Sequence, residues 1–234
     1  MKNSAIEWTD NTLSFFVGCK KVSEGCANCY MYRLETRWGR DPSIVRKTNW
    51  KSVETNLKNW TPSKIFVNHM SDTFHPDITT DQLNEMFGMI AKYPQHTYLI
   101  LTKRIETAVK YFQDKRVPDN IWIGTSVESE KYMWRINKLR MIDAKIRFVS
   151  FEPLLGLINL KSSDLSGISW VIVGGESDFH PRPMLPIYAE TILQVCQANG
   201  IKFFFKQWGG SKKCECHKSW GCRLLSGRTW DEMP

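Results

Sequence analysis

The sequence of 234 residues predicts an α/β fold, specifically a partial or open (β/α) barrel of about six to seven parallel strands. Three observations lead to this prediction. Short β-rich apolar runs alternate with segments of helical pattern, and several of these runs are apolar throughout, as strands covered on both faces are. The repeated strand-then-helix units are also too few to close an eight-stranded barrel. Such an alternation implies a parallel sheet with right-handed crossovers.

The individual elements follow from residue type and spacing. Strands are expected where β-branched and aromatic residues lie between turn residues, at 13–17, 64–70, 97–103, 121–129, 146–154, 169–177 and 201–209. Helices are expected at 80–92, 105–112, 130–141 and 187–199, the last stopped by Gly200. No repeat or linker splits the chain. We therefore expect residues 1–209 to form the barrel and residues 210–234 to form a C-terminal extension packed on it.

Composition narrows the classes of function. The chain has 32 Lys and Arg against 24 Asp and Glu, and its net charge of +8 favours a polyanionic partner such as nucleic acid. No apolar stretch approaches the ~18 residues of a membrane helix, and the N-terminus lacks the apolar run of a signal peptide. We expect a cytoplasmic protein with no membrane partner. In that reducing compartment, seven clustered cysteines favour metal binding over disulfides.

Polar residues gather where the predicted strands end. They are Asn68, His69, Ser71 and Asp72, then Thr102, Lys103 and Arg104, then Ser126 and Glu128, then Ser150 and Glu152, then Gly174, Gly175, Glu176 and Ser177. Any one of them is explained equally well by helix capping. As a set they predict a binding site, because ligands of open α/β folds bind at the carboxyl ends of the strands.

The stretch "GCKKVSEGCANCY" places Cys19, Cys26 and Cys29 after the first predicted strand, and so at the same mouth. Thiolates in the pattern C-x6-C-x2-C suit zinc or an iron–sulfur cluster. Structural zinc needs a fourth ligand, for which Cys196, His217 or a C-terminal cysteine is available. A cluster held by three cysteines instead leaves one iron open to a small molecule.

The C-terminal stretch "KCECHKSWGC" forms a second group of metal-binding residue types. It contains Cys214, Cys216, His217 and Cys222 within nine positions, enough for a complete zinc site or a second cluster. Cys196 lies in a helical pattern and is expected to be a buried apolar residue.

Ten short motifs occur in order along nearly the whole chain. They are "IEWTD", "GCKKVSEGCANCY", "MSDTFHPDI", "LTKR", "SVES", "SFEPLLG", "VIVGGES", "RPM", "FFFKQWG" and "GRTWDEMP". Through these ten motifs the chain resembles a phage-associated family of radical-SAM-like proteins with a long-spaced three-cysteine motif. It departs from the common CxxxCxxC pattern by three extra residues, carries Asn28 before the last cysteine, and places "GGE" after its sixth strand.

The resemblance implies a 4Fe-4S cluster on Cys19, Cys26 and Cys29 whose unique iron chelates S-adenosylmethionine. Reduction by an electron donor would then cleave S-adenosylmethionine and release a 5′-deoxyadenosyl radical. At the strand ends we expect Ser71 or Asp72 to contact the methionine amino group.

The remaining strand ends are expected to serve the nucleoside and the chemistry. Ser126 and Glu128 are predicted to hold the ribose hydroxyls. Gly174 and Gly175 let backbone approach a ligand, and Glu176 beside them is expected to bind the cofactor. Candidate catalytic residues are Lys103, which is also suited to a carboxylate or phosphate, Glu152 and Glu176.

Two function classes remain open from the sequence. The first is a radical S-adenosylmethionine enzyme acting on a nucleotide or nucleic-acid substrate. Tryptophans interleaved with Arg and Lys in residues 30–60 favour such a substrate. The second is a zinc-stabilised nucleic-acid-binding module without catalysis.

Overall fold

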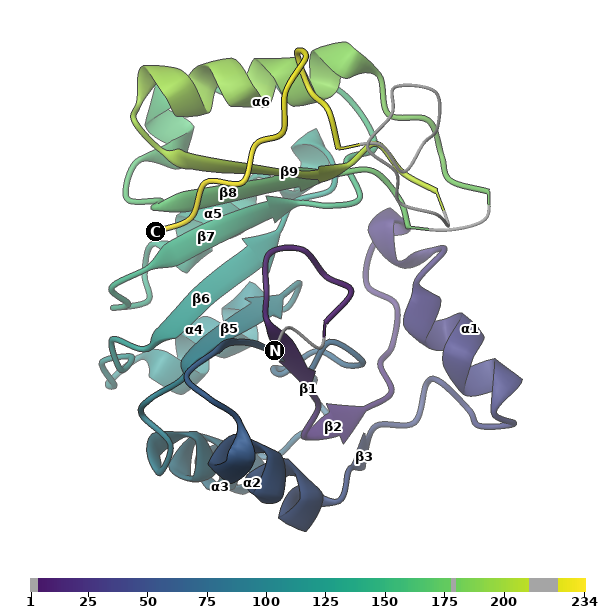
Figure 1. Cartoon of the computed structure of the whole chain (residues 1–234), viewed down its shortest axis with the longest axis vertical. Coiled ribbons are helices and arrows are strands. Elements are labelled where there is room, and N and C mark those ends of the chain that lie inside the picture. The colour runs from purple at the N-terminus through teal and green to yellow at the C-terminus, as the bar shows by residue number, and fades with distance from the viewer. Residues whose placement is uncertain (1–3, 178–179, 211–222) are drawn as a thin grey trace.

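The computed structural model describes residues 4–177, 180–210 and 223–234. Within them, seven strands form one parallel sheet in the order β1-β4-β5-β6-β7-β8-β9, and Figure 1 shows that this sheet curls into a half-barrel. The strands are β1 (Asn11–Leu13), β4 (Lys64–Val67), β5 (Thr97–Thr102), β6 (Ile121–Ser126), β7 (Arg147–Phe151), β8 (Trp170–Gly174) and β9 (Lys202–Gln207). The partial barrel of parallel strands expected from the sequence is therefore confirmed.

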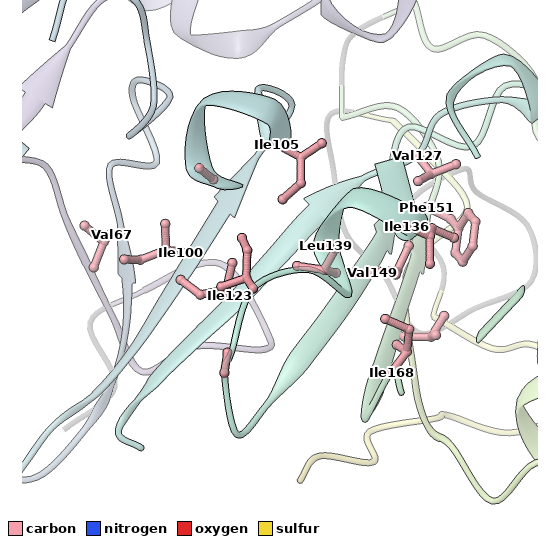
Figure 2. Close-up of a cluster of buried hydrophobic side chains, with 14 of the residues drawn as sticks. Val67, Ile100, Ile105, Ile123, Val127, Ile136, Leu139, Val149, Phe151 and Ile168 are labelled. Atoms are coloured by element: carbon pink, nitrogen blue, oxygen red, sulfur yellow. The ribbon is translucent and has the colours of Figure 1, made fainter. Parts of the chain in front are cut away.

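Helices lie around the outer face of the sheet (Figure 1). They are α2 (Trp50–Asn59), α3 (Thr80–Ala91), α4 (Ile105–Phe112), α5 (Trp134–Leu139) and α6 (Pro186–Ala198). Figure 2 shows Ile100, Ile123 and Val149 of neighbouring strands in one buried cluster with Ile136 and Leu139 of α5. Each such fully buried aliphatic side chain stabilises the fold by about 1.5–3 kcal/mol relative to exposure.

The inner face of the half-barrel has a second, smaller apolar cluster. It consists of Trp8, Leu99, Phe148, Trp170, Ile172 and Phe204. Trp8 comes from the segment before β1 and packs its ring against Phe66 at 4.6 Å between centroids and against Trp170 at 6.1 Å. Side chains alternate between the two faces of the sheet along each strand. Further inward-pointing residues, nearer the carboxyl ends of the strands, therefore lie above this cluster.

The first predicted strand is wrong in detail, because residues 13–17 divide between two strands. β1 ends at Leu13, and β2 (Phe16–Val17) pairs antiparallel with β3 (Arg46–Lys47). The division has a local cause: the side-chain oxygen of Asn68 accepts the backbone N–H groups of Phe15 and Phe16 at 2.8 and 3.1 Å. Those groups therefore cannot continue the parallel ladder.

Two helices were not expected from the sequence. They are α1 (Tyr30–Arg37), which follows the three cysteines, and α2, which the side chain of Asn49 caps by accepting the N–H groups of Lys51 and Ser52. Trp50 of α2 is buried and packs in the main core. Only part of the aromatic segment 30–60 is therefore at the surface, where Trp38 is 54% exposed.

The helical segment at 130–141 is shorter than expected, because a 3-10 turn (Glu130–Tyr132) precedes α5. The final described segment, 223–234, runs along β9, where Asp231 bridges to Phe204 and Trp230 lies in the main core. Among the described residues, no helix is both long and apolar enough to cross a membrane.

Candidate active site

A cavity of about 230 Å³ opens at the carboxyl ends of the strands. Its walls come from the cysteine segment and from the ends of five neighbouring strands, β4 to β8, with Lys206 added from β9. Among the residues that line it are Cys19, Cys26, Cys29, Ser71, Asp72, Lys103, Arg104, Ser126, Ser150, Glu152, Gly175, Glu176 and Lys206. The parallel sheet thus brings together polar groups that are far apart in the sequence.

The cysteine loop, residues 18–29, is fixed at its start by contacts with the end of β4. Gly18 has a φ of +97°, and a side chain there would meet the carbonyl oxygen of Ile44 at 2.1 Å. Its N–H donates to the carbonyl of Met70 at 3.1 Å, and its own carbonyl accepts the Ser71 hydroxyl at 2.6 Å. Only glycine allows this close approach of two backbones.

The three loop cysteines are free, partly buried thiols that all line the cavity. Burial raises the pKa of Cys19 to about 11, against the opposing charge of Arg104, and burial also raises the pKa of Cys29. The guanidinium Nη1 of Arg104 lies 3.4 Å from the sulfur of Cys19. Arg104 is therefore placed to stabilise the thiolate form of Cys19.

The three loop cysteines suit a cluster better than a single metal ion. Among the described residues, no group of three or more His, Cys, Asp or Glu side chains is arranged to hold a single metal ion. A four-iron cluster takes one thiolate on each of three different irons, so its cysteines need not converge on one point. Three thiols around one cavity fit such a cluster in ligand type and number. The other predicted ligands, Cys214, Cys216, His217 and Cys222, lie outside the described residues.

Asp72 joins the ends of β4 and β5 beside the loop. Its Oδ1 accepts the Thr102 hydroxyl at 2.6 Å, and its Oδ2 accepts the backbone N–H of Lys103 at 3.0 Å. Arg104 lies 3.2 Å from the same Oδ2. Asp72 thereby orients the guanidinium that contacts Cys19.

Glu128 lies fully buried beneath the cysteine loop and does not line the cavity. Its carboxylate accepts the Ser23 hydroxyl at 2.6 Å and pairs with Lys103 and Arg135, each at 2.7 Å. Burial acts to raise the pKa of Glu128, but the charges of Lys103 and Arg135 outweigh it and hold the pKa below its usual value. Glu128 therefore carries a buried negative charge that joins the loop to the ends of β5 and β6.

Glu176 makes a third connection, from the end of β8 to the loop. It accepts the side-chain amide of Asn28 at 2.9 Å, and Arg182 donates to it from the backbone N–H at 3.0 Å and from Nε at 3.1 Å. Burial opposes ionisation, but the hydrogen bonds from Arg182 hold the pKa of Glu176 below its usual value. A side chain on the adjacent Gly175 would meet the carbonyl oxygen of Trp208 at 1.7 Å.

The inner wall of the cavity carries one further ion pair. Lys206 of β9 contacts Glu152, which follows β7, across Gly174 of β8. Ser150 lies one inward position before Glu152 and is fully buried.

Most of the predicted site residues therefore gather at one cavity, with Glu128 placed under the loop and Gly174 placed beneath the Glu152–Lys206 pair. Four residues of the site are not among those predicted from the sequence: Ser23, Arg135, Arg182 and Lys206. Three of them carry a signal in the sequence, and Ser23 does so as part of "GCKKVSEGCANCY". Arg182 belongs to the motif "RPM", and Lys206 is a charged residue inside the otherwise aromatic run "FFFKQWG".

The sequence matches part of one known protein, and the structure matches solved structures of a lyase. Over 95 residues, 38% of this chain and 36% of the other protein, the sequence is 32% identical to killer cell lectin-like receptor 6 of Mus musculus. Spore photoproduct lyase complexed with dinucleoside spore photoproduct is 14% identical, with a TM-score of 0.48 over 79% of this chain. A variant of that lyase with bound AdoMet and dinucleoside spore photoproduct is 14% identical, with a TM-score of 0.48 over 78% of this chain.

The chain thus spans 36% of the receptor and 59% of each lyase chain. The family match is far more extensive. Because residues 3–234 match the family described as "Protein of unknown function (DUF5131)", the chain belongs to that family.

Proposed function

We propose that this protein is a radical S-adenosylmethionine enzyme that acts on a nucleotide or nucleic-acid substrate. The observation that carries the proposal is the position of Cys19, Cys26 and Cys29. Their thiols line a cavity at the carboxyl ends of the strands of a parallel half-barrel. That edge of an open α/β sheet is where a cofactor and a substrate can be reached by many loops at once.

Cys19, Cys26 and Cys29 would hold a 4Fe-4S cluster. When bound, this cluster would supply the electron, received from an external donor, that cleaves S-adenosylmethionine reductively at its sulfonium. Three protein thiolates leave the fourth iron position to a small molecule. Arg104 stabilises the thiolate form of Cys19, and Asp72 fixes the orientation of Arg104.

The strand ends would bind and orient S-adenosylmethionine. Ser71 and Asp72 line the cavity next to the cysteine loop and are proposed to face the methionine amino group, with Lys103 near the carboxylate. Ser126, at the end of β6, is proposed to contact the ribose. Glu128 was expected at the ribose as well, but its buried carboxylate does not line the cavity; its contacts with Ser23 and Lys103 hold the cysteine loop in place.

A nucleotide substrate is supported by charge and by exposed aromatic surface. The chain carries a net charge of +8, and Trp38 after α1 is 54% exposed with the Arg40 guanidinium 5.6 Å from its ring. An exposed indole beside a cation suits base stacking and phosphate contact.

The test is anaerobic reconstitution followed by a dithionite-reduced assay for 5′-deoxyadenosine. The wild-type protein should take up about four irons and release 5′-deoxyadenosine and methionine. The triple variant Cys19→Ala, Cys26→Ala and Cys29→Ala should lose both properties. The control variant Cys196→Ala changes a buried helical thiol outside the cavity and should keep them.

One result would reject the proposal. If fully loaded protein neither binds S-adenosylmethionine by calorimetry nor releases 5′-deoxyadenosine, the enzyme assignment is wrong. Bound zinc instead of iron would then support a zinc-stabilised nucleic-acid-binding module.

A further inference from the structure

The ion pair on the inner wall is built into the sheet. Lys206 sits at a register shift between β8 and β9, where Val173 faces Phe205 and Gly174 faces Gln207. Such a bulge re-aims a side chain, and bulges are frequent beside active sites. A side chain on Gly174 would lie 3.3 Å from Cβ of Lys206 and 3.5 Å from Cδ of Glu152. Glycine at 174 therefore leaves the space in which the two charged groups meet.

The pair is largely removed from water yet faces the cavity. The side chain of Lys206 is 11% exposed and that of Glu152 is 17% exposed, and both residues line the cavity. An ammonium group has three N–H donors and a carboxylate has about four acceptor positions, so one mutual contact leaves both with capacity for a ligand. Burying two charged groups in this way is costly, and apolar residues would stabilise the sheet equally well. The pair therefore indicates a role beyond stability.

A second polar group at the same wall has no partner. The hydroxyl of Ser150 is fully buried, lines the cavity and makes no hydrogen bond within the described part of the chain. A buried hydroxyl without a partner is costly, so it indicates a group that a ligand completes. Ser150, Glu152 and Lys206 thus form one polar strip.

Apolar side chains also line the cavity. Ile6, Trp8, Phe66 and Leu101 line the cavity, and the rings of Trp8 and Phe66 pack against each other. A ligand in contact with both groups of side chains meets an aromatic and aliphatic surface along with a polar strip that carries no net charge. A charged ligand group would leave one buried charge uncompensated, whereas a neutral group that both donates and accepts satisfies the two partners together.

We propose that Glu152 and Lys206 bind the hydrogen-bonding edge of a nucleobase and so select the substrate within the cavity. Every nucleobase presents an N–H donor next to an acceptor on one edge of a flat, neutral ring. Glu152 accepts from that N–H, and Lys206 donates to the adjacent oxygen or ring nitrogen. Ser150 adds a third contact. This assignment rests on the proposed function, because it names the substrate class of the same cavity.

The experiment measures nucleoside binding by calorimetry with the cluster-loaded protein in the presence of S-adenosylmethionine, and again with the metal-free protein. The probes are adenosine, cytidine, guanosine and uridine. Each is compared with a counterpart methylated at the donor on that edge, such as N3-methyluridine for uridine. Ribose 5-phosphate, which has no base, is expected not to bind. At least one nucleoside should bind, and its methylated counterpart should bind at least ~10-fold more weakly because a hydrogen bond to a charged group is lost.

Two variants test the pair itself. Lys206→Met removes the donor at similar length, and the double variant Lys206→Met with Glu152→Leu removes both charges, so that no unpaired buried charge destabilises the fold. Both should weaken nucleoside binding at least ~10-fold while S-adenosylmethionine affinity and iron content stay at the wild-type level. Lys202→Met, at an exposed position of the same strand, is the matched control and should change nothing.

The outcomes separate this assignment from the proposed function. If cluster and S-adenosylmethionine bind but no nucleoside does, or if the folded double variant binds nucleosides like the wild type, the assignment is overturned alone. Equal loss of S-adenosylmethionine and nucleoside binding in the double variant also overturns it, because the pair then serves the cofactor. Pair-dependent nucleoside binding by a protein that takes up no cluster supports the assignment and rejects the radical-enzyme function.

Discussion

Asn28 donates its side-chain amide to Glu176 at 2.9 Å, across 148 residues of sequence. Asn28 lies between Cys26 and Cys29, and Glu176 follows β8, so the contact joins the cysteine loop to the far side of the cavity. Glu128 joins the same loop to β5 and β6 through Ser23 and Lys103. The loop is therefore held on both sides by carboxylates, which positions its thiols before any metal binds.

Asn28→Asp should weaken the hold on the loop, because the new carboxylate faces Glu176 and the two like charges repel. We expect the free energy of unfolding to fall by about 1.5–3 kcal/mol, the usual worth of a hydrogen bond to a charged group, and the iron content after reconstitution to fall. Urea denaturation and iron analysis are the measurements. Asn56→Asp adds the same charge at an exposed position of α2 and should leave both quantities unchanged. Equal behaviour of the two variants would mean that the contact does not fix the loop.

Glu128→Gln should be more damaging. It removes the charge that Lys103 and Arg135 share, and the side chain of Arg135 is 3% exposed. Removing one partner of a buried ion pair costs about 3–5 kcal/mol, because a charge is left uncompensated. Denaturation in urea gives this value, and Glu106→Gln, at an exposed position at the start of α4, is the control. A loss below about 1 kcal/mol would contradict a structural role of the buried carboxylate.

The half-barrel was predictable because its strands are long apolar runs. β8 is buried at every residue, so its sequence is apolar throughout, and α4 has the bounds that its pattern predicts, residues 105–112. α2 also carried a usable signal, since Asn49 is a capping residue and Trp50, Val53 and Leu57 recur at helical spacing. The tryptophans interleaved with Arg and Lys in residues 30–60 instead predict a nucleic-acid-binding surface.

The sequence was sufficient to predict which strand ends form the site, but not which charged side chains pair with each other. Parallel topology places Asp72, Glu152 and Glu176 at one edge whatever their partners are. The pairing of Glu152 with Lys206, 54 residues away, depends on the register shift opposite Gly174. Nothing local in the sequence specifies that register, so tertiary contacts decide which charges meet.

Acidification should destabilise the metal-free protein through His69. Burial lowers the pKa of His69 from 6.5 to about 4, so between these values the unfolded chain binds a proton that the folded chain does not. The contribution of His69 to stability is thus fully present above pH 6.5 and is lost as the pH falls toward 4, by about 3 kcal/mol in total. Urea unfolding across this range measures the loss. His69→Gln should show a shallower decline, and parallel curves for the two proteins would contradict the predicted titration.

Gly25→Ala should disturb the cysteine loop by contact alone, without changing any charge. Gly25 lies in the turn just before Cys26, and a Cβ there would lie 2.4 Å from Cγ of Glu128 and 2.7 Å from its Oε1. Glu128 cannot move aside freely because Ser23, Lys103 and Arg135 hold its carboxylate. Overpacking of this kind costs about 1–3 kcal/mol, and the displaced loop should retain less iron after reconstitution. Gly88→Ala in α3 is the matched control, because a Cβ there meets nothing within 4 Å and should stabilise the helix by about 0.5–1 kcal/mol. In urea denaturation, Gly25→Ala should therefore be less stable than the wild type and Gly88→Ala more stable. In iron analysis, only Gly25→Ala should have a lower cluster content. Wild-type stability and iron content in Gly25→Ala would show that the loop does not pack on Glu128.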